Sequence, residues 1–422
     1  MTPPRARRRD LAVRAAVKAG LLDPDEAPLA AFLDLDGIRA TVHELHRAWP
    51  AEPPQVLHAF AAKANSLVPV LGLLRELRLG CEVAGPEELD LALAAGFAPD
   101  RVVLDSPVKT RSELARALAL GIAVNIDNYQ ELARVDTLRA DRPQASRLGV
   151  RINPQVGTGT IEAMSTAGRT TKFGIALDDP GSRERLLAAY AERPWLRWVH
   201  VHVGSQGIPL ALTAAGVAAA VDFADEVNRH RPGQVEGIDV GGGLAVDFDT
   251  DADGAGFADH AAALRSAAPG LFDGRYRIVT EFGRSLLAKN GFLASRVEYT
   301  KTSGGRPIAL THAGAQVATR TVFAPDAWPL RVLAYDAEGR PSTAAPAVQD
   351  VAGPACFAGD LVARGRELPL LAAGDLVVLP DTGAYYFSTH FSYNSLPTPP
   401  VHGFDMAPDG TVAFTLFRPA GG

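Results

Sequence analysis

Residues 56–95 read VLHAFAAKANSLVPVLGLLRELRLGCEVAGPEELDLALAA, and this stretch decides the fold. Two short apolar runs, Val56–Ala62 and Cys81–Ala84, are each followed by a longer amphipathic pattern, around Val68–Leu79 and Glu87–Ala95. Short runs of this kind are typical of strands that are buried on both faces. The intervening helical patterns are long enough to cross over the sheet and return the chain parallel to the previous strand.

The same alternation continues along most of the chain. A third helical pattern covers Ser112–Leu120, and six further apolar runs follow at Arg101–Leu104, Ile122–Ile126, Leu148–Ile152, Trp198–Val203, Gly237–Val240 and Tyr276–Glu281. Eight strand–helix repeats predict a closed (β/α)₈ TIM barrel over residues 36–295, although an open doubly wound sheet would give the same local pattern.

The pattern changes after Thr302. A turn cluster at Ser303–Pro307 is followed by short strand-like runs, at Pro307–Thr311, Leu330–Ala334, Asp375–Leu379 and Thr411–Phe417. We therefore expect a mostly-β C-terminal domain over residues 296–422. Three prolines favour a loop over Glu338–Pro354. Residues 1–35 are expected to form an N-terminal arm and a strand that packs on the β domain.

Composition excludes several classes of protein. Of 422 residues, 47% are apolar and 21% are charged, which is typical of globular chains and not of disordered ones. The 42 basic and 48 acidic side chains give a net charge of −6. This balance argues against a nucleic-acid partner, which usually meets a strongly basic face. No run of about 18 apolar residues is present, so we expect no membrane partner.

Four arginines at positions 5–9 resemble the charged start of an export signal, but Arg14 and Lys18 interrupt the stretch that follows. We predict a solvated basic arm instead. The two cysteines, Cys81 and Cys356, are too few for a secreted disulfide scaffold. They favour a reducing, cytoplasmic location.

Lys63 follows the first run, and His200 and His202 lie in a later one. A lysine after a strand is ordinarily just solvated, but a barrel places its active groups at the C-terminal ends of its strands, where a partly desolvated lysine can bind an aldehyde. The two histidines face the same side of a strand. They would hold a metal only with further ligands, so we predict none. Instead, His202 can cover a planar cofactor, while Ser205 donates a hydrogen bond to an anion.

A glycine run, Gly241–Gly243, lets the backbone approach an anion closely and lacks the lysine of a nucleotide P-loop. The last run ends in Glu281-Phe282-Gly283-Arg284, whose charged residues could form a surface ion pair. Alternatively, Glu281 binds a cationic ring nitrogen and Arg284 binds a phosphate. An aldehyde, a planar ring, a protonated nitrogen and a phosphate together describe pyridoxal 5′-phosphate (PLP).

With these residues the sequence resembles the barrel-type (fold type III, alanine racemase-like) PLP-dependent amino-acid decarboxylases, and among them most the diaminopimelate decarboxylases. The resemblance covers residues 30–415. It is carried by Ala62-Lys63-Ala64-Asn65, His202–Gln206, Gly241–Gly243, Glu281–Arg284, Gly353–Cys356, Gly359-Asp360, Gly383–Tyr385 and Tyr393-Asn394.

The resemblance implies a role for each matching residue. Lys63 would hold the cofactor, His202 would stack on its ring and Glu281 would bind the ring nitrogen. The phosphate would be bound by the group Ser205, Gly242, Gly243, Gly283, Arg284 and Tyr385. Cys356 would donate a proton in the active site of a neighbouring subunit, which implies a homodimer with shared sites. Arg284, Arg320, Phe357 and Tyr385 would contact the amino-acid substrate.

The chain departs from the family pattern at the far end of the substrate site. Phe357 stands where diaminopimelate decarboxylases have a glutamate for the distal ammonium, and Phe323 stands in place of a tyrosine. Arg320, for the distal carboxylate, is kept. We therefore expect Cα decarboxylation of a carboxylate-bearing amino acid or conjugate, as in specialised metabolism, unless another acid such as Glu162 replaces the missing one.

Three alternatives stay open at this level. The first is a true diaminopimelate decarboxylase of lysine biosynthesis. The second is an amino-acid racemase, although racemases of this fold commonly pair the ring nitrogen with arginine rather than with a residue like Glu281. The third is a non-catalytic PLP-binding relative, although both Lys63 and Cys356 are present.

Overall fold

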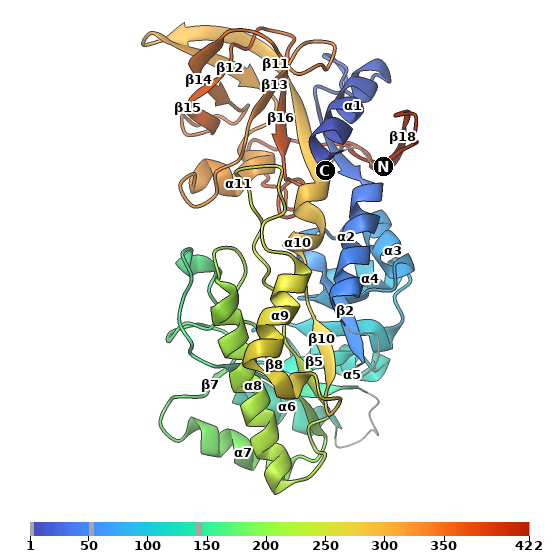
Figure 1. Cartoon of the computed structure of the whole chain (residues 1–422), viewed down its shortest axis with the longest axis vertical. Coiled ribbons are helices and arrows are strands. Elements are labelled where there is room, and N and C mark those ends of the chain that lie inside the picture. Colours follow the sequence, from blue (N-terminus) through green and yellow to red (C-terminus); the bar gives the residue numbers. More distant parts are fainter. Residues whose placement is uncertain (1–3, 50–54, 140–145, 422) are drawn as a thin grey trace. The chain divides into compact units, whose positions relative to one another are not determined.

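The computed structural model describes residues 4–49, 55–139 and 146–421, which form two compact units (Figure 1). The barrel unit comprises Val42–Ala245 and Gly254–Ser285. The sheet unit comprises the chain up to Thr41, Val246–Asp253, and the chain from Leu286 onward. The domain boundaries predicted at residues 35 and 295 stay predictions. None of the helices in the described ranges is long and apolar enough to cross a membrane.

Eight parallel strands form the barrel. They are β2 Val56–Ala61, β3 Gly80–Val83, β4 Val102–Asp105, β5 Ala123–Ile126, β6 Leu148–Asn153, β8 Leu196–Val201, β9 Gly237–Asp239 and β10 Arg277–Thr280. The sheet closes because β5 pairs with both β4 and β6, and β2 pairs with both β3 and β10. A two-residue strand, β7 (Ile175–Ala176), also pairs with β6. The closed barrel predicted from the apolar runs is confirmed, and the open sheet is excluded.

Helices connect the barrel strands as the amphipathic patterns predict. They are α2 Leu35–Ala48, α3 Val68–Glu76, α4 Pro86–Ala94, α5 Arg111–Leu120, α6 Tyr129–Arg139, α7 Ser182–Glu192, α8 Leu210–His230 and α9 Phe257–Ala267. The ends of α5 show how the sequence sets these bounds. Thr110 and Glu113 form a capping box at its start, and Gly121, with φ of 79°, ends it.

The sheet unit is mostly β, as expected. Its strands are β1 Leu29–Asp34, β11 Gly291–Ser303, β12 Arg306–Thr311, β13 Leu333–Tyr335, β14 Pro346–Ala352, β15 Leu361–Pro369, β16 Leu376–Pro380, β17 Val401–Met406 and β18 Val412–Arg418. They follow the order β15-β14-β12-β11-β1-β17-β18, and β16 pairs with β11 and β13. The unit also contains α1 (Arg5–Lys18) and α11 (Ala315–Phe323), while the short α10 (Arg284–Leu287) spans the division between the units.

The expectation of a solvated basic arm at the N-terminus is wrong. The arginine-rich segment forms α1, in which Arg8 and Arg9 are buried. Arg8 donates to Asp34 at 2.6 Å, and Arg9 donates to Asp251 at 2.8 Å. Burial of these cations is tolerated because each is paired with a carboxylate.

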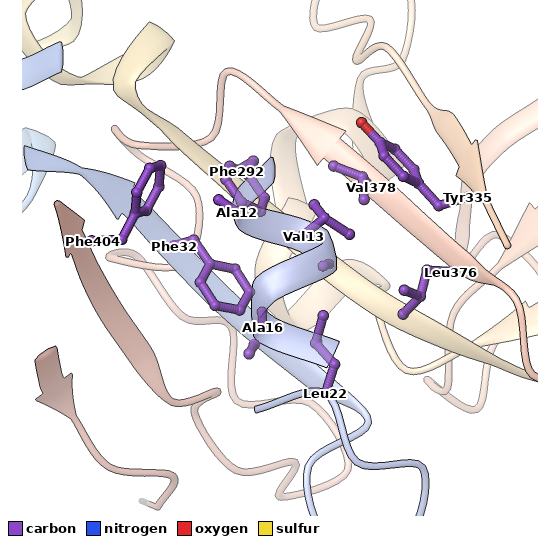
Figure 2. Close-up of a cluster of buried hydrophobic side chains, with 12 residues drawn as sticks. Ala12, Val13, Ala16, Leu22, Phe32, Phe292, Tyr335, Leu376, Val378 and Phe404 are labelled. Atoms are coloured by element: carbon purple, nitrogen blue, oxygen red, sulfur yellow. The ribbon is translucent and has the colours of Figure 1, made fainter. Parts of the chain in front are cut away.

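The following turns of the same buried face of α1 explain why the helix docks. Figure 2 shows its Ala12, Val13 and Ala16 side chains in a buried cluster with aromatic residues that include Phe32 and Phe292. Their spacing along α1 is that of one helical face. The apolar residues at positions 12, 13 and 16 therefore turn an apparent arm into part of the core.

The loop expected over Glu338–Pro354 is also partly wrong, because β14 occupies Pro346–Ala352. This strand pairs in parallel with β12 and antiparallel with β15. Proline is tolerated at the first residue of a strand, where its missing N–H matters least. Residues Gln349–Ala352 are buried, and the side-chain amide of Gln349 donates to the carbonyls of Leu368 and Pro369 at 3.0 Å.

Candidate active site

Four neighbouring strands of the barrel unit place the predicted cofactor residues at one end of the barrel. Lys63 lies in a 3-10 turn (Ala62–Ala64) after β2, and His202 follows β8 directly. The glycine run follows β9, and Glu281 follows β10. Because these strands are parallel and pair in the order β2-β10-β9-β8, their C-terminal ends meet at one mouth.

Backbone contacts join these segments closely. The N–H of Gly242 donates to Nδ1 of His202 at 3.1 Å, and the N–H of Glu281 donates to the carbonyl of Gly241 at 2.7 Å. A Cβ added at Gly242 would lie 2.2 Å from the Glu281 carbonyl oxygen. At Gly243, with φ of 115°, it would lie 2.1 Å from the Gly204 carbonyl oxygen. Only glycine fits at positions 242 and 243, so the backbone of the glycine run is free to approach a bound group; we call this backbone the glycine cradle.

The other predicted phosphate-binding residues lie on the same segments. Ser205 follows Gly204, and its N–H donates to the carbonyl of Met164 at 3.1 Å. Gly283 and the buried Arg284 come directly after Glu281, at the start of α10. The structure thus brings Lys63 and the residues His202, Ser205, Gly242, Gly243, Glu281, Gly283 and Arg284 to the same end of the barrel unit.

Lys63 is the accessible amine of this mouth, with a side chain 44% exposed. Its amine donates to the carboxylate of Glu82 on β3, which is completely buried. Burial raises the pKa of Glu82 to about 7, although the neighbouring Lys63 amine acts in the opposite direction. Sequence reasoning did not single out Glu82; an acid within an otherwise apolar strand run was the available signal.

Glu281 lies in a site that disfavours an isolated carboxylate. Burial, and after it the Glu82 carboxylate, raise the pKa of Glu281 well above its usual range. Burial, and after it Glu281, raise the pKa of Asp239 to about 8. The Oε1 atom of Glu281 is buried and has no hydrogen-bond partner among the described residues. A cationic nitrogen would donate a hydrogen bond to this oxygen, and its positive charge would offset the repulsion between the neighbouring carboxylates.

His200 lies between two buried acids. Its Nε2 lies 3.6 Å from Glu281 Oε2, and its Nδ1 lies 3.6 Å from Asp105 Oδ1. Burial opposes ionisation of Asp105, but Arg151, which donates to it at 3.0 Å, holds the pKa of this carboxyl well below its usual range. His200 is completely buried within β8, and His202 follows the end of the same strand at the mouth. Sequence reasoning missed Asp105 and Arg151, which end or interrupt apolar runs.

The residues present fit PLP. The amine of Lys63 matches the aldehyde of PLP, and the ring of His202 matches its planar ring. The closely packed glycine backbone matches the phosphate, and the buried acceptor oxygen of Glu281 matches the ring nitrogen. Burial lowers the pKa of His202 well below its usual range, so its ring is neutral and adds no competing charge.

The remaining predicted residues lie in the sheet unit. The guanidinium carbon of Arg320 lies 4.8 Å from the ring centre of Tyr385 and 4.9 Å from that of Trp328. Cys356 is exposed and free, and its backbone N–H donates to Asn394 Oδ1 at 2.8 Å. The Phe357 ring stacks on Phe323.

Asp360 fixes the loop that carries Cys356. Its two carboxylate oxygens accept hydrogen bonds from the N–H groups of Ala315 and Ala355, at 2.6 and 2.7 Å. A Cβ at Gly314 or Gly353 would lie 2.4 Å from this carboxylate. The Gly-Asp pair that the sequence singled out as a family mark therefore joins the cysteine loop to the start of α11.

A closed parallel barrel with a lysine, an acid and a glycine cradle at the C-terminal ends of its strands defines the class: a PLP-dependent enzyme of the barrel type. Residues 39–288 match the family model described as "Pyridoxal-dependent decarboxylase, pyridoxal binding domain". The chain belongs to this family of decarboxylases and is a PLP-dependent carboxy-lyase.

Individual relatives agree with this assignment. The chain is 33% identical to the diaminopimelate decarboxylase of Pseudomonas aeruginosa over 363 residues, 85% of this chain and 84% of the relative. It is 30% identical to that of Methanothermobacter thermautotrophicus over 370 residues, 86% and 83% of the two chains. The crystal structure of diaminopimelate decarboxylase from Helicobacter pylori complexed with L-lysine is 25% identical, with a TM-score of 0.81 over 96% of this chain and 97% of that one.

Proposed function

We propose that the protein removes the α-carboxylate, as CO₂, from an amino acid whose side chain ends in a second carboxylate and carries no distal ammonium. The observation that carries this substrate is Arg320. Its Nη1 atom is buried and has no hydrogen-bond partner among the described residues, which leaves a guanidinium donor ready for an anion. Phe357 offers no charge to a distal ammonium, and burying an ammonium without a partner would cost several kcal/mol.

Each predicted residue has a task in this proposal. When bound, PLP supplies a carbonyl that condenses with amines and a protonated ring that withdraws electrons. Lys63 would hold the cofactor, and His202 would cover its ring and exclude water. Glu281 Oε1 would accept a hydrogen bond from the ring nitrogen and keep that nitrogen protonated. The phosphate would be held by Ser205, Gly242, Gly243, Gly283, Arg284 and Tyr385.

Cys356 would complete the reaction by giving its thiol proton to the substrate Cα after CO₂ leaves. We propose that it does so in the site of a second subunit, so that the enzyme is a homodimer with shared sites. Two observations support this proposal: Cys356 is exposed in the single chain, and Asp360 fixes the loop that carries it. A cytoplasmic location is part of the proposal too, since both cysteines are free.

Diaminopimelate decarboxylation is the second candidate. Its support is specific, because the Pseudomonas aeruginosa and Methanothermobacter thermautotrophicus relatives bear this name over more than four-fifths of their length. It would require another acid, such as Glu162, in place of the one missing at Phe357.

A CO₂-release screen tests the proposal. The PLP-loaded protein is assayed with meso-diaminopimelate, 2-aminopimelate, ornithine, lysine and arginine, beside a Lys63→Ala variant. Lys301→Ala, an exposed lysine on β11, is the matched control. We expect the unmodified protein to release CO₂ from 2-aminopimelate. Lys63→Ala should lose this activity, and Lys301→Ala should keep it. No CO₂ release from 2-aminopimelate, or faster release from diaminopimelate, ornithine, lysine or arginine, would contradict the proposal.

A further inference from the structure

Four aromatic side chains of the sheet unit form one continuous group, which we call the aromatic cluster: Phe323, Phe357, Phe391 and Tyr393. The rings of Phe323 and Phe357 have their centres 5.4 Å apart and are tilted by only 7°. Phe357 meets Tyr393 edge-on at 5.3 Å, and Phe323 meets Phe391 edge-on at 5.7 Å. Phe391 and Tyr393 stack at 5.9 Å, which closes the group into a ring of contacts.

The cluster is not covered within its own unit. Phe323 is 57% exposed, and the other three rings are half-buried. A contiguous group of partly exposed rings of this kind often marks a binding surface. Stacked and edge-on contacts hold the rings in place, so the surface of ring faces and edges is already formed.

The cluster lies next to two residues that have a task in the proposed function. Phe357 follows Cys356 in the sequence, and Phe323 lies one helical turn from Arg320 in α11, on the same face. Arg320 in turn lies over the ring of Tyr385, whose φ of 63° marks a strained backbone of the kind that clusters at functional sites. A substrate side chain held by Arg320 would therefore lie beside this aromatic surface.

The chemistry of this surface selects one kind of group. It offers ring faces and edges and a single hydroxyl, on Tyr393, and none of its four members is charged. A flexible methylene chain would gain from burial alone, whereas a flat ring would gain stacking contacts as well. We propose that the aromatic cluster binds an aromatic ring in the substrate's side chain, with Arg320 holding a carboxylate attached to that ring. This inference rests on the proposed function and names its substrate class.

Binding of unreactive analogues tests the inference without turnover. The two probes are 3-(4-carboxyphenyl)propanoate and pimelate, both dicarboxylates, of which only the first contains a ring. Titration calorimetry on the PLP-loaded protein should show the aryl compound binding about tenfold more tightly, as expected for one added stacking contact. Phe357→Leu and Phe323→Leu should each reduce this preference to less than about threefold. Tyr299→Leu, an exposed aromatic residue on β11, should keep it.

Three results would overturn the inference. One is equal affinity for the two probes in the unmodified protein. Another is a preference that survives both leucine variants. The third is a change in oligomeric state of the leucine variants, measured by sedimentation, with probe affinities unchanged, which would make the cluster a subunit contact.

Turnover separates this inference from the proposed function. CO₂ release from 2-aminopimelate at a kcat/KM equal to that for 4-carboxyphenylalanine would leave the decarboxylase proposal standing and overturn the aromatic one. The expected result is a kcat/KM about tenfold higher for the aryl amino acid.

Discussion

The backbone N–H of Gly242 donates a hydrogen bond to Nδ1 of His202, at 3.1 Å. Since burial keeps this imidazole neutral, Nδ1 is the acceptor and the proton resides on Nε2. The glycine run therefore has two tasks, because it forms the cradle and also fixes the orientation of the ring beside it.

This relationship predicts how His202 variants behave. His202→Ala removes the flat ring and should weaken PLP binding about tenfold, the value of one ring contact. His202→Phe keeps a ring and should weaken it less than about threefold. Equilibrium dialysis against PLP measures both, with His230→Ala, an exposed histidine near the end of α8, as control. Equal losses in the Ala and Phe variants would show that the ring contributes no stacking.

Arg284 should contribute through charge. We expect Arg284→Ala to weaken PLP binding by about 1.5–3 kcal/mol, the value of a hydrogen bond to a charged group. Arg229→Ala, an exposed arginine on α8, should leave PLP affinity unchanged. PLP affinity in Arg284→Ala equal to that of the unmodified protein would mean that the phosphate is bound elsewhere.

The buried acids should make the stability of the cofactor-free protein depend on pH. Burial raises the pKa of Asp239 to about 8, so the folded chain holds this proton at pH values where the unfolded chain has lost it. The stability that the raised pKa of Asp239 contributes is complete below about pH 4 and is lost as the pH rises toward 8.

Urea unfolding at pH 5.5 and 8 measures this effect. Between these pH values the free energy of unfolding of the unmodified protein should fall more than that of Asp239→Asn, by on the order of 2 kcal/mol. Parallel pH profiles for the two proteins would contradict the assignment of a raised pKa to Asp239.

Shared sites predict complementation between inactive variants. Lys63→Ala and Cys356→Ala should each lose nearly all CO₂ release, but a mixture should form hybrid dimers with one intact site. Equal mixing should restore about a quarter of the unmodified activity. No recovery, with subunit exchange demonstrated by fluorescence transfer between labelled chains, would rule out sites shared between subunits.

Much of the barrel was predictable because its strands are short runs of Val, Ile and Leu, buried on both faces, with amphipathic helices between them. The sheet unit was harder to predict. Pro346 suggested a loop, yet β12 and β15 supply the pairing that makes β14 a strand. Likewise, α1 looked like a solvated arm because the acids that pair with Arg8 and Arg9 are far away in the sequence or in another element.

In the site, too, residues marked by a local sequence pattern were predictable, whereas contacts between residues far apart in the sequence were not. Lys63, His202 and Glu281 could be singled out because each lies at or near the C-terminal end of its own apolar run. The network beneath them could not, because Glu82 and Asp105 come from different strands and meet only once the barrel closes. The stacking of Phe323 on Phe357 is likewise a contact that no local pattern contains.

The most direct test of the account compares two substrates in one preparation of PLP-loaded protein: meso-diaminopimelate and 2-aminopimelate, which lacks the distal amino group. Because Phe357 provides no charge for an ammonium, we predict a higher kcat/KM for CO₂ release from 2-aminopimelate, with diaminopimelate below about 10⁴ M⁻¹s⁻¹. A kcat/KM for meso-diaminopimelate above that value and above that of 2-aminopimelate would contradict the account and assign the chain to diaminopimelate decarboxylation.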